Sequence, residues 1–371
     1  MPAARRPPGA MNPLDLFSPS YEVARRRFRD AARAAGASVE QHRVDTGEAG
    51  VDLTIDVATL GGREPSWAVV VSSGVHGVEG FFGSAIQLAW LSGQTAGEPP
   101  PRDGVVVLIH AVNPSGFARL RRTNEHNVDL NRNFLDTADA YAGAPDGYET
   151  LNPFLNPASP LAPLESFRLK ALWHIRRHGL RVLKDAVAGG QYRFPLGLFF
   201  GGHGPASSTK IIRNHLAGWL GGARRAVHVD LHSGLGAHGR YRLLLEESAP
   251  SPNVEWYRDT FGSEVVEPLA SDGISYVATG TLGGWAVTHL GDTRFRFVCA
   301  EVGTYPILRV LGSLRAENRA HFFGRPRSGA HQRAKAELLE CFCPRSDRWR
   351  EKVVEQGLAI IDRAVRSQRI G

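Results

Sequence analysis

The sequence has 371 residues, of which 42% are hydrophobic and 22% charged, the balance expected of a globular protein with a full core. No apolar stretch is as long as a membrane-spanning helix, which needs about 20 residues, so no membrane partner is expected. Three cysteines cannot build a disulfide framework, and we therefore expect a cytoplasmic protein. The net charge of +7 comes largely from scattered arginines, without the basic stripe or the motifs that indicate a nucleic-acid-binding protein.

The N-terminus is expected to be a flexible arm over residues 1–18. It carries charge but lacks the apolar segment of a secretory signal, and Met11 is an alternative start. Residues 18–36 then have the pattern of an amphipathic helix that is capped by Ser18 or Ser20 and ends at a glycine. The ordered part of the chain is therefore expected to begin with a helix.

The next elements alternate between strands and helices. Residues 51–57 alternate as in a strand, and residues 67–72 form a continuous valine-rich run, which is typical of a strand buried on both faces. A helix is expected over 81–91 and a second buried strand over 104–112. Strand, helix and strand in this order predict a right-handed crossover within a largely parallel sheet.

Two irregular segments interrupt the second half of the chain. Residues 135–163 are rich in Ala, Pro, Asn and Gly and are expected to form a long surface loop, and residues 189–206 form a second glycine-rich loop. Further helices are expected over 164–188, 209–220 and 348–366, and further strands over 226–231, 241–245 and 295–300. Residues 19–371 are thus predicted to form a single α/β domain, with a mixed, mostly parallel central sheet flanked by helices.

Two distant segments carry residues that suit one metal ion. His76 and Glu79 follow a buried strand, and His232 follows another, with Asp230 two residues before it. Two histidines and one glutamate leave a position open for water, which is the arrangement of catalytic zinc. Because parallel strands place their carboxyl ends at one edge of a sheet, these side chains are expected to converge, and Asp230 is a candidate to orient a ligand.

Structural interpretations compete with these functional ones. His76 and Glu79 alone could be a solvated helix start, and Glu301, which ends a third buried strand, could be a buried carboxylate paired with an arginine. Cys299 is best interpreted as a small buried hydrophobic residue. His203 is best interpreted as a solvent-facing histidine in a glycine-rich loop.

The order of the motifs resembles that of the zinc carboxypeptidase superfamily. The similarity spans about Trp67 to Glu301 and is nearest to a poorly characterised bacterial branch, related to the murein-peptide amidases and the succinylglutamate desuccinylase/aspartoacylase group. Its most specific part is the Arg-x-Asn…Val-Asp-Leu-Asn-Arg-Asn-Phe string. The motifs that carry the resemblance are His76-x-x-Glu79, Asn113-Pro114-Ser115-Gly116-Phe117, Arg122, Asp129-Leu130-Asn131-Arg132-Asn133-Phe134, Asp230-x-His232-Ser233 and Glu301.

The resemblance implies a role for each matching residue. It implies that one zinc ion is held by His76, Glu79 and His232. It further implies that Arg122, or its neighbour Arg121, polarises the scissile carbonyl, that Asn131 and Arg132 hold a substrate carboxylate, and that Glu301 is the general base. The family often places a late tyrosine over the substrate, and Tyr276 and Tyr305 are both candidates here.

The expected function is zinc-dependent hydrolysis of an amide bond next to a free carboxylate. Both a carboxypeptidase acting on short peptides and an N-acyl-amino-acid deacylase fit these residues, and cobalt or manganese would use the same ligand types as zinc. A catalytically silent zinc- or peptide-binding module is the alternative from another class. A basic nucleic-acid-binding protein is a third, which only the net charge favours.

Overall fold

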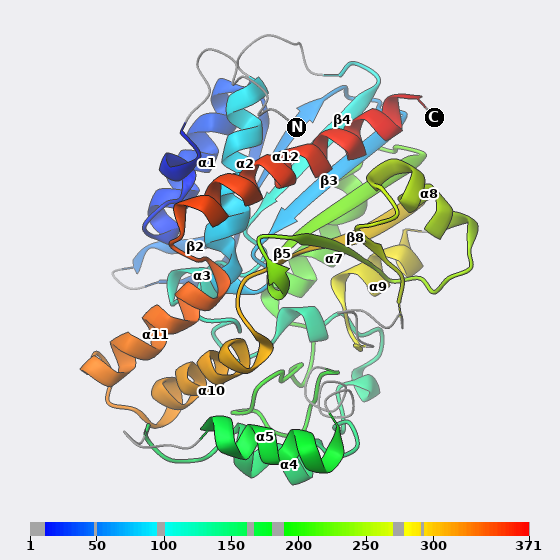
Figure 1. The fold of residues 1–371 in the computed structure, drawn as a ribbon. Coiled ribbons are helices and arrows are strands. Elements are labelled where there is room, and N and C mark those ends of the chain that lie inside the picture. Colours follow the sequence, from blue (N-terminus) through cyan, green and yellow to red (C-terminus); the bar gives the residue numbers. More distant parts are fainter. Residues whose placement is uncertain are drawn as a thin grey trace.

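The computed structural model describes residues 12–47, 50–94, 101–161, 167–179, 189–269, 278–290 and 293–370. Its centre is an eight-stranded sheet with the order β1-β2-β4-β3-β5-β8-β6-β7 (Figure 1). The strands are β1 (Ser38–Thr46), β2 (Asp52–Gly61), β3 (Trp67–Ser73), β4 (Gly104–His110), β5 (Arg225–His238), β6 (Tyr241–Leu245), β7 (Val266–Glu267) and β8 (Arg294–Gly303).

Helices and short 3-10 turns connect these strands. The α-helices are α1 (Tyr21–Ala34), α2 (Gly80–Gln94), α3 (Pro114–Ala118), α4 (Tyr148–Leu155), α5 (Phe167–His178), α7 (Ser207–Trp219), α8 (Pro252–Phe261), α9 (Leu282–His289), α10 (Ile307–Phe323), α11 (Gly329–Phe342) and α12 (Asp347–Ile370). The 3-10 turns are η1 (Pro13–Leu16), η3 (Gly77–Glu79), η4 (Leu130–Arg132) and η5 (Ala138–Ala140).

The sheet is mixed, with a parallel centre, as predicted. Strands β4, β3, β5 and β8 run parallel to one another, whereas β1, β2 and β6 pair in antiparallel fashion with their neighbours toward the centre. Strand β3 shows why a continuous apolar run occurs there. Val69 and Val71 belong to one core cluster and Ala68 and Val70 to the other, because successive side chains point to opposite faces.

Each face of the sheet is covered by its own helices. Helices α1, α2 and α12 pack on one face, where Phe28, Phe82 and Ile361 are fully buried. Helices α7 and α9 cover the other face, through Ile212 and Leu282 among others. Figure 1 shows α12 crossing the first face obliquely, with α7 and α9 behind the sheet. The arrangement is a three-layer α/β/α domain.

Part of the segment expected to be a flexible arm is packed against the domain. Pro13 and Leu16 of η1 are buried, within the segment for which a flexible arm was expected; residues 1–11 lie outside the described part. Ser20 is the N-cap of α1, since its side chain accepts a hydrogen bond from the backbone N–H of Val23 at 3.4 Å. Gly36 follows the helix with a φ of 78°, in the left-handed region that favours glycine.

The irregular segments differ from expectation in one respect. The segment 135–163 contains α4, which buries Tyr148, Leu151 and Leu155, so it is not only a surface loop. The helix expected over 164–188 is present over Phe167–His178, and residues 180–188 lie outside the described part. Among the described residues, no helix combines the length and the apolar character needed to cross a bilayer.

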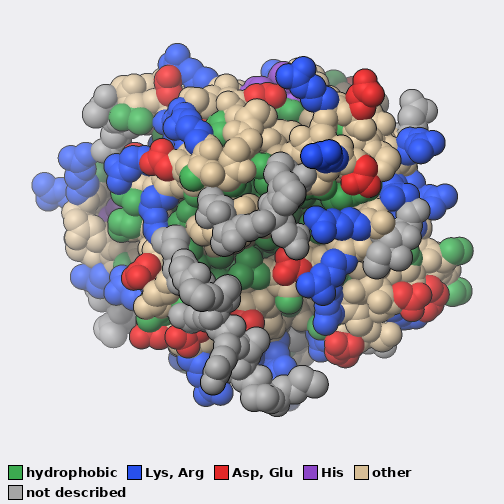
Figure 2. All heavy atoms as spheres, turned by 90° about the horizontal axis from the view of Figure 1, so that it is seen from above, with side chains coloured by type: hydrophobic (Ala, Val, Ile, Leu, Met, Phe, Trp, Pro, Cys, Tyr) green, Lys and Arg blue, Asp and Glu red, His purple; other side chains and the backbone are tan. Residues whose placement is uncertain are grey.

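Charged side chains are dispersed over the surface. In the view of Figure 2, Lys and Arg side chains lie around the whole outline, with Asp and Glu among them. This distribution agrees with the scattered arginines of the sequence.

Candidate metal centre

The candidate metal residues meet at the carboxyl ends of the central parallel strands. His76 and Glu79 follow β3, with Glu79 in the turn η3 that leads into α2. Strand β5 continues to His238, so His232 lies inside this strand rather than after it. Its neighbour across the β5–β8 pair is Glu301, which brings the predicted base next to the predicted ligand.

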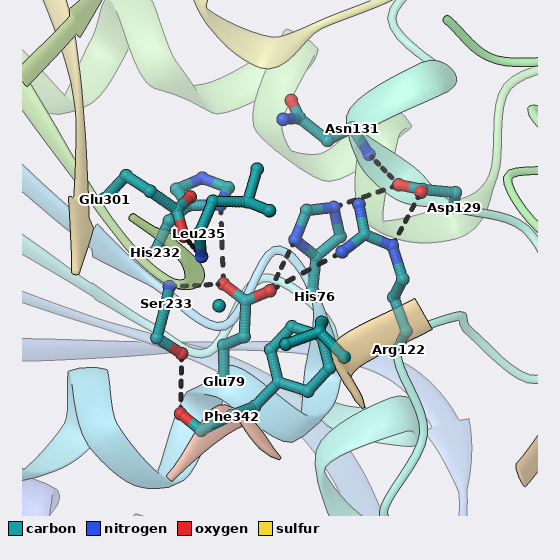
Figure 3. A network of polar contacts seen from close by, with 12 residues as sticks. His76, Glu79, Arg122, Asp129, Asn131, His232, Ser233, Leu235, Glu301 and Phe342 are labelled. Carbon is teal, nitrogen blue, oxygen red and sulfur yellow. Dashed lines mark hydrogen bonds and ion pairs between the residues drawn. The ribbon is translucent and has the colours of Figure 1, made fainter. Parts of the chain in front are cut away.

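Three buried side chains form a candidate metal site. Nδ1 of His76 lies 2.9 Å from Oε1 of Glu79, and Nδ1 of His232 lies 3.4 Å from Oε2 of the same carboxylate (Figure 3). One ligand atom from each residue lies within 4.8 Å of the other two. Two imidazole nitrogens and a carboxylate are the donor set of catalytic zinc, and all three residues are buried, so the site fits such an ion.

Two aspartates hold the histidines from behind. Oδ1 of Asp129 lies 3.1 Å from Nε2 of His76, and Oδ2 of Asp230 lies 2.6 Å from Nε2 of His232. Ser72 in turn donates to Oδ1 of Asp230 at 2.6 Å. A carboxylate on the second nitrogen orients the ring and leaves Nδ1 free to bind a metal.

Asp230 was predicted to orient a ligand, and its position agrees with that role. The contact of Asp129 was missed, although this residue belongs to the most specific string of the sequence. One of its partners, Arg122, belongs to the same string, so an ion pair between the two could have been suspected from the sequence. The other partner, His76, comes from a distant segment.

The side chains of the candidate site shift one another's ionisation. Burial opposes the ionisation of Glu79, but the adjacent His76 and His232 hold the pKa of its carboxyl well below the usual range. Burial also opposes charge on His232, yet Cys299 and Asp230 raise the pKa of its imidazole. The carboxylate of Glu79 thus stays ionised, which is the form that binds a cation.

Glu301 is a buried carboxyl group beside the three ligands. Its Oε1 accepts a hydrogen bond from the backbone N–H of Leu235 at 2.8 Å. Burial, together with the charge of Glu79, raises the pKa of Glu301 to about 8. Cys299, two residues earlier on β8, lines the same pocket and is only half-buried, rather than a buried hydrophobic residue. Both side chains therefore face the site, as strand alternation allows.

The two adjacent arginines point in different directions. Arg122 lines the pocket, with Nε 3.0 Å from Oδ2 of Asp129 and Nη1 3.6 Å from Oε1 of Glu79. Arg121 instead lies in the protein interior, where its Nε is 3.0 Å from Oε1 of Glu317. The structure therefore places Arg122, and not Arg121, at the candidate site.

Asn131 and Arg132 border the same pocket on the far side of Asp129. The side-chain Oδ1 of Asn131 accepts a hydrogen bond from the backbone N–H of Leu282 at 2.9 Å, which directs this amide toward α9. Nη1 of Arg132 donates to the backbone oxygen of Asn131 at 2.6 Å, and the arginine side chain is fully buried. Both side chains line the pocket that contains the metal residues.

The candidate tyrosines are not both described. Tyr305 does not border the pocket; its hydroxyl donates to Oε1 of Glu340 at 2.6 Å. Tyr276 lies outside the described residues. His203 is exposed and stays apart from the pocket, as its loop sequence indicated.

Comparisons with known proteins identify a family and structures of similar fold. A family model described as a protein of unknown function, DUF2817, matches residues 17–356. No curated protein sequence matches the chain significantly. Among solved structures, bovine thrombin-activatable fibrinolysis inhibitor in complex with tick carboxypeptidase inhibitor is similar with a TM-score of 0.52 and 12% identity, over 95% of this chain and 98% of that one.

Two further structures are less similar. Carboxypeptidase A from Helicoverpa armigera has a TM-score of 0.45 and 13% identity, over 86% of this chain and 73% of that one. Succinylglutamate desuccinylase from Chromobacterium violaceum has a TM-score of 0.37 and 13% identity, over 89% of this chain and 76% of that one. The likeness to the bovine structure, at 12% identity, concerns the fold alone; the fold is carboxypeptidase-like, as expected from the sequence motifs.

Proposed function

The chain belongs to the DUF2817 family, and we propose that it is a zinc-dependent hydrolase that cleaves an amide bond next to a free carboxylate. One observation carries the proposal. His76, Glu79 and His232 converge on one point, and Glu301 and Arg122 line the same pocket. A site that only binds metal would need neither a buried carboxyl group nor an arginine beside its ligands.

His76 and His232 would hold the ion through Nδ1, and Glu79 through its carboxylate. Zinc bound there would act as a Lewis acid and lower the pKa of its bound water to about 7. Cobalt or manganese could take the same ligands, so the metal in the cell also depends on availability. Asp129 and Asp230 keep both imidazoles in the orientation that this binding requires.

Glu301 is the proton carrier in this proposal. Its carboxylate accepts the proton of the attacking water and then delivers it to the nitrogen of the leaving amine. The hydrogen bond from the backbone N–H of Leu235 to Oε1 fixes the carboxyl group. The nearby Arg122 donates to the carbonyl oxygen as it gains negative charge.

The substrate carboxylate is assigned to Asn131 and Arg132. A guanidinium offers a planar pair of donors that matches a carboxylate, which a lysine cannot reproduce. Nδ2 of Asn131 is left to donate because its Oδ1 is occupied by the N–H of Leu282. Short peptides and N-acyl amino acids both present a carboxylate next to the scissile amide, and both are proposed substrate classes.

We also propose a cytoplasmic location. Cys299, Cys341 and Cys343 are all free thiols in the structure, which is the usual state in a reducing compartment.

Metal analysis and a substrate screen test the hydrolase. The purified protein is expected to contain about one zinc per chain and to hydrolyse N-acyl amino acids or dipeptides. A chelator should abolish this activity, and added zinc should restore it. His76→Ala should lose both metal and activity. A protein that retains zinc but cleaves no member of either substrate class would instead be a silent binding module.

A further inference from the structure

The pocket above the metal site has two sides of different chemistry. Asn131 and Arg132 lie on the side of α9, where Thr281 and Glu246 also line the wall. If the substrate carboxylate binds there, the leaving amino acid occupies this side. The acyl half of the substrate must then extend in the opposite direction, past Arg122.

The opposite side is apolar and is built by α4, α5 and α10. Arg122 marks its beginning, since the guanidinium carbon lies 5.2 Å from the centre of the Phe199 ring. Phe199 belongs to the hydrophobic cluster that includes Leu151, Leu155 and Leu314. Figure 1 shows α4 and α5 next to α10, on the side of the domain away from α12. We call this side, lined by Leu151, Leu155, Ile175, Phe199, Leu311 and Leu314, the apolar compartment.

The apolar compartment suits an alkyl chain better than a peptide. A peptide extending in this direction would bring backbone N–H and C=O groups that need hydrogen-bond partners when buried. Among the described lining residues from α4, α5 and α10, only His174 has a polar side chain. A hydrocarbon chain needs no partners and gains free energy from leaving water.

The pocket opens to solvent on the side of α10. Ile307 lines it there and is 41% exposed. A hydrocarbon chain can therefore reach the apolar compartment from this side.

We propose that the natural substrates are N-acyl amino acids with a medium or long hydrocarbon chain, and that the apolar compartment holds this chain. The proposal rests on the hydrolase function proposed above and selects the deacylase over the carboxypeptidase. In the reaction the amide C–N bond breaks and the water oxygen bonds to the acyl carbon. The leaving nitrogen takes a proton, so the products are a fatty acid and a free amino acid.

A chain-length series tests the proposal directly. The zinc-loaded protein is assayed with N-acetyl-, N-butanoyl-, N-octanoyl- and N-dodecanoyl-leucine below their micelle concentrations, and with N-acetyl-Gly-Gly-Leu as a peptide of comparable length. We expect kcat/KM to rise by up to about fourfold for each methylene that is buried. The peptide should be a poorer substrate than N-octanoyl-leucine.

A matched pair of variants on one helix locates the chain. Ile175 on α5 lines the pocket and is half-buried, whereas Leu172 on the same helix is 53% exposed and does not line it. Ile175→Asp should lower the ratio of the dodecanoyl to the acetyl kcat/KM at least tenfold, because it places a charge beside the chain. Leu172→Asp should leave both values unchanged.

Binding of dodecanoate, measured by calorimetry, gives a readout independent of turnover. The wild type and Leu172→Asp should bind it, and Ile175→Asp should bind it at least tenfold more weakly. Chelator-sensitive cleavage with no preference for longer chains would overturn the acyl-chain proposal and leave the hydrolase intact. If no substrate is cleaved, the proposed hydrolase function is wrong. If dodecanoate also fails to bind, the proposal that the apolar compartment holds an acyl chain is wrong as well.

Discussion

His76 and Arg122 are held by one carboxylate, because the two oxygens of Asp129 lie 3.1 Å from Nε2 of His76 and 3.0 Å from Nε of Arg122. Asp129 is fully buried. Burial opposes its ionisation, but Arg122 and His76 hold the pKa of its carboxyl well below the usual range. The proposed metal ligand and the proposed carbonyl-binding arginine are therefore positioned by the same group.

Asp129→Asn should weaken metal binding and catalysis together. An amide keeps the size of the side chain but carries no charge, so it orients His76 less well and removes the ion pair between Arg122 and residue 129. Loss of such a partner typically lowers metal affinity about 10- to 100-fold. Competition with a chromogenic chelator measures the affinity, and kcat at saturating zinc measures the effect on Arg122. The control is Asp139→Asn, at an exposed position, which should change neither the zinc affinity nor kcat. Asn124 is buried and is therefore not a suitable control position.

Glu301→Gln should abolish turnover while the metal stays bound. Glutamine fills the same space and can still accept the Leu235 hydrogen bond, but it cannot take a proton. General-base catalysis typically contributes a factor of about 10²–10⁴, so kcat should fall by that amount. Zinc content by elemental analysis is expected to equal that of the wild type. Full activity of this variant would remove Glu301 as the base.

Arg121→Lys and Arg122→Lys should separate stability from catalysis. A lysine at 122 cannot present the same donors to a developing oxyanion, and kcat should fall about 100-fold with little effect on unfolding. A lysine at 121 cannot contact Glu317, Asn127 and Asn318 together. Arg121→Lys should therefore lower the free energy of unfolding by about 1–3 kcal/mol, measured in urea, with unchanged kcat. The reverse pattern would exchange the roles of the two arginines.

Glu246 should disfavour acidic amino acids as leaving groups. Its carboxyl lines the pocket on the α9 side and accepts hydrogen bonds from the Thr281 side chain and the Gly284 backbone; burial raises its pKa. The substrate's α-carboxylate is paired with Arg132 in our proposal, but a second carboxylate, on the side chain of the leaving amino acid, would be repelled by ionised Glu246. We expect kcat/KM for N-acetyl-aspartate to be at least about tenfold below that for N-acetyl-asparagine, a difference of about 1.4 kcal/mol.

Glu246→Gln should reduce this discrimination. Glu247→Gln is the matched control, since Glu247 does not line the pocket and its Oε2 accepts from Ser251 instead. An equal ratio of the two kcat/KM values in the wild type and in Glu246→Gln would show that another group disfavours N-acetyl-aspartate.

His110 should make the protein less stable in mild acid. The residue is fully buried, its ring stacks on Phe28 with centroids 4.6 Å apart, and burial lowers its pKa to about 3. An unfolded histidine has a pKa of about 6.5. Between these values the unfolded chain binds a proton that the folded chain does not, so stability falls as the pH falls through 6.5 toward 3.

The size of this effect can be measured with His110→Phe. By pH 5 the wild type should lose about 2 kcal/mol through this residue relative to pH 7.5, and the variant should not. Urea unfolding at both pH values gives the difference. His203→Phe, at an exposed loop position, should keep the wild-type pH dependence. Equal losses of unfolding free energy in the wild type, His110→Phe and His203→Phe would contradict the assignment of this pH dependence to His110.

Much of the fold follows from local patterns in the sequence. The runs at Trp67–Ser73 and Gly104–His110 are continuous because both faces of these strands are covered, and such runs are recognisable without a structure. Strand β1 was missed because its side chains are largely exposed or half-buried, which leaves little hydrophobic signal. Helix α4 was missed because its segment is rich in Pro, Asn and Gly, although Tyr148 and Leu151 pack inward.

The convergence of the candidate metal ligands was predictable because their chemistry and spacing are visible in the sequence itself. His76 and Glu79 follow β3, Glu301 lies near the end of β8, and His232 lies opposite Glu301 within β5; neighbouring parallel strands bring these positions together. The identity of these residues and their order along the chain therefore indicated a common site before any coordinates.

Only the tertiary structure decided which neighbours these residues have. Arg122 is the better match to the motif, but Arg121 is adjacent to it; the packing of Glu317 against Arg121 and of Asp129 against Arg122 distinguishes them. The apolar compartment is likewise not recognisable in sequence, since α4, α5 and α10 are far apart along the chain. The reason is physical: local patterns report how each segment buries its own side chains, whereas partners and cavities arise between segments that meet only on folding.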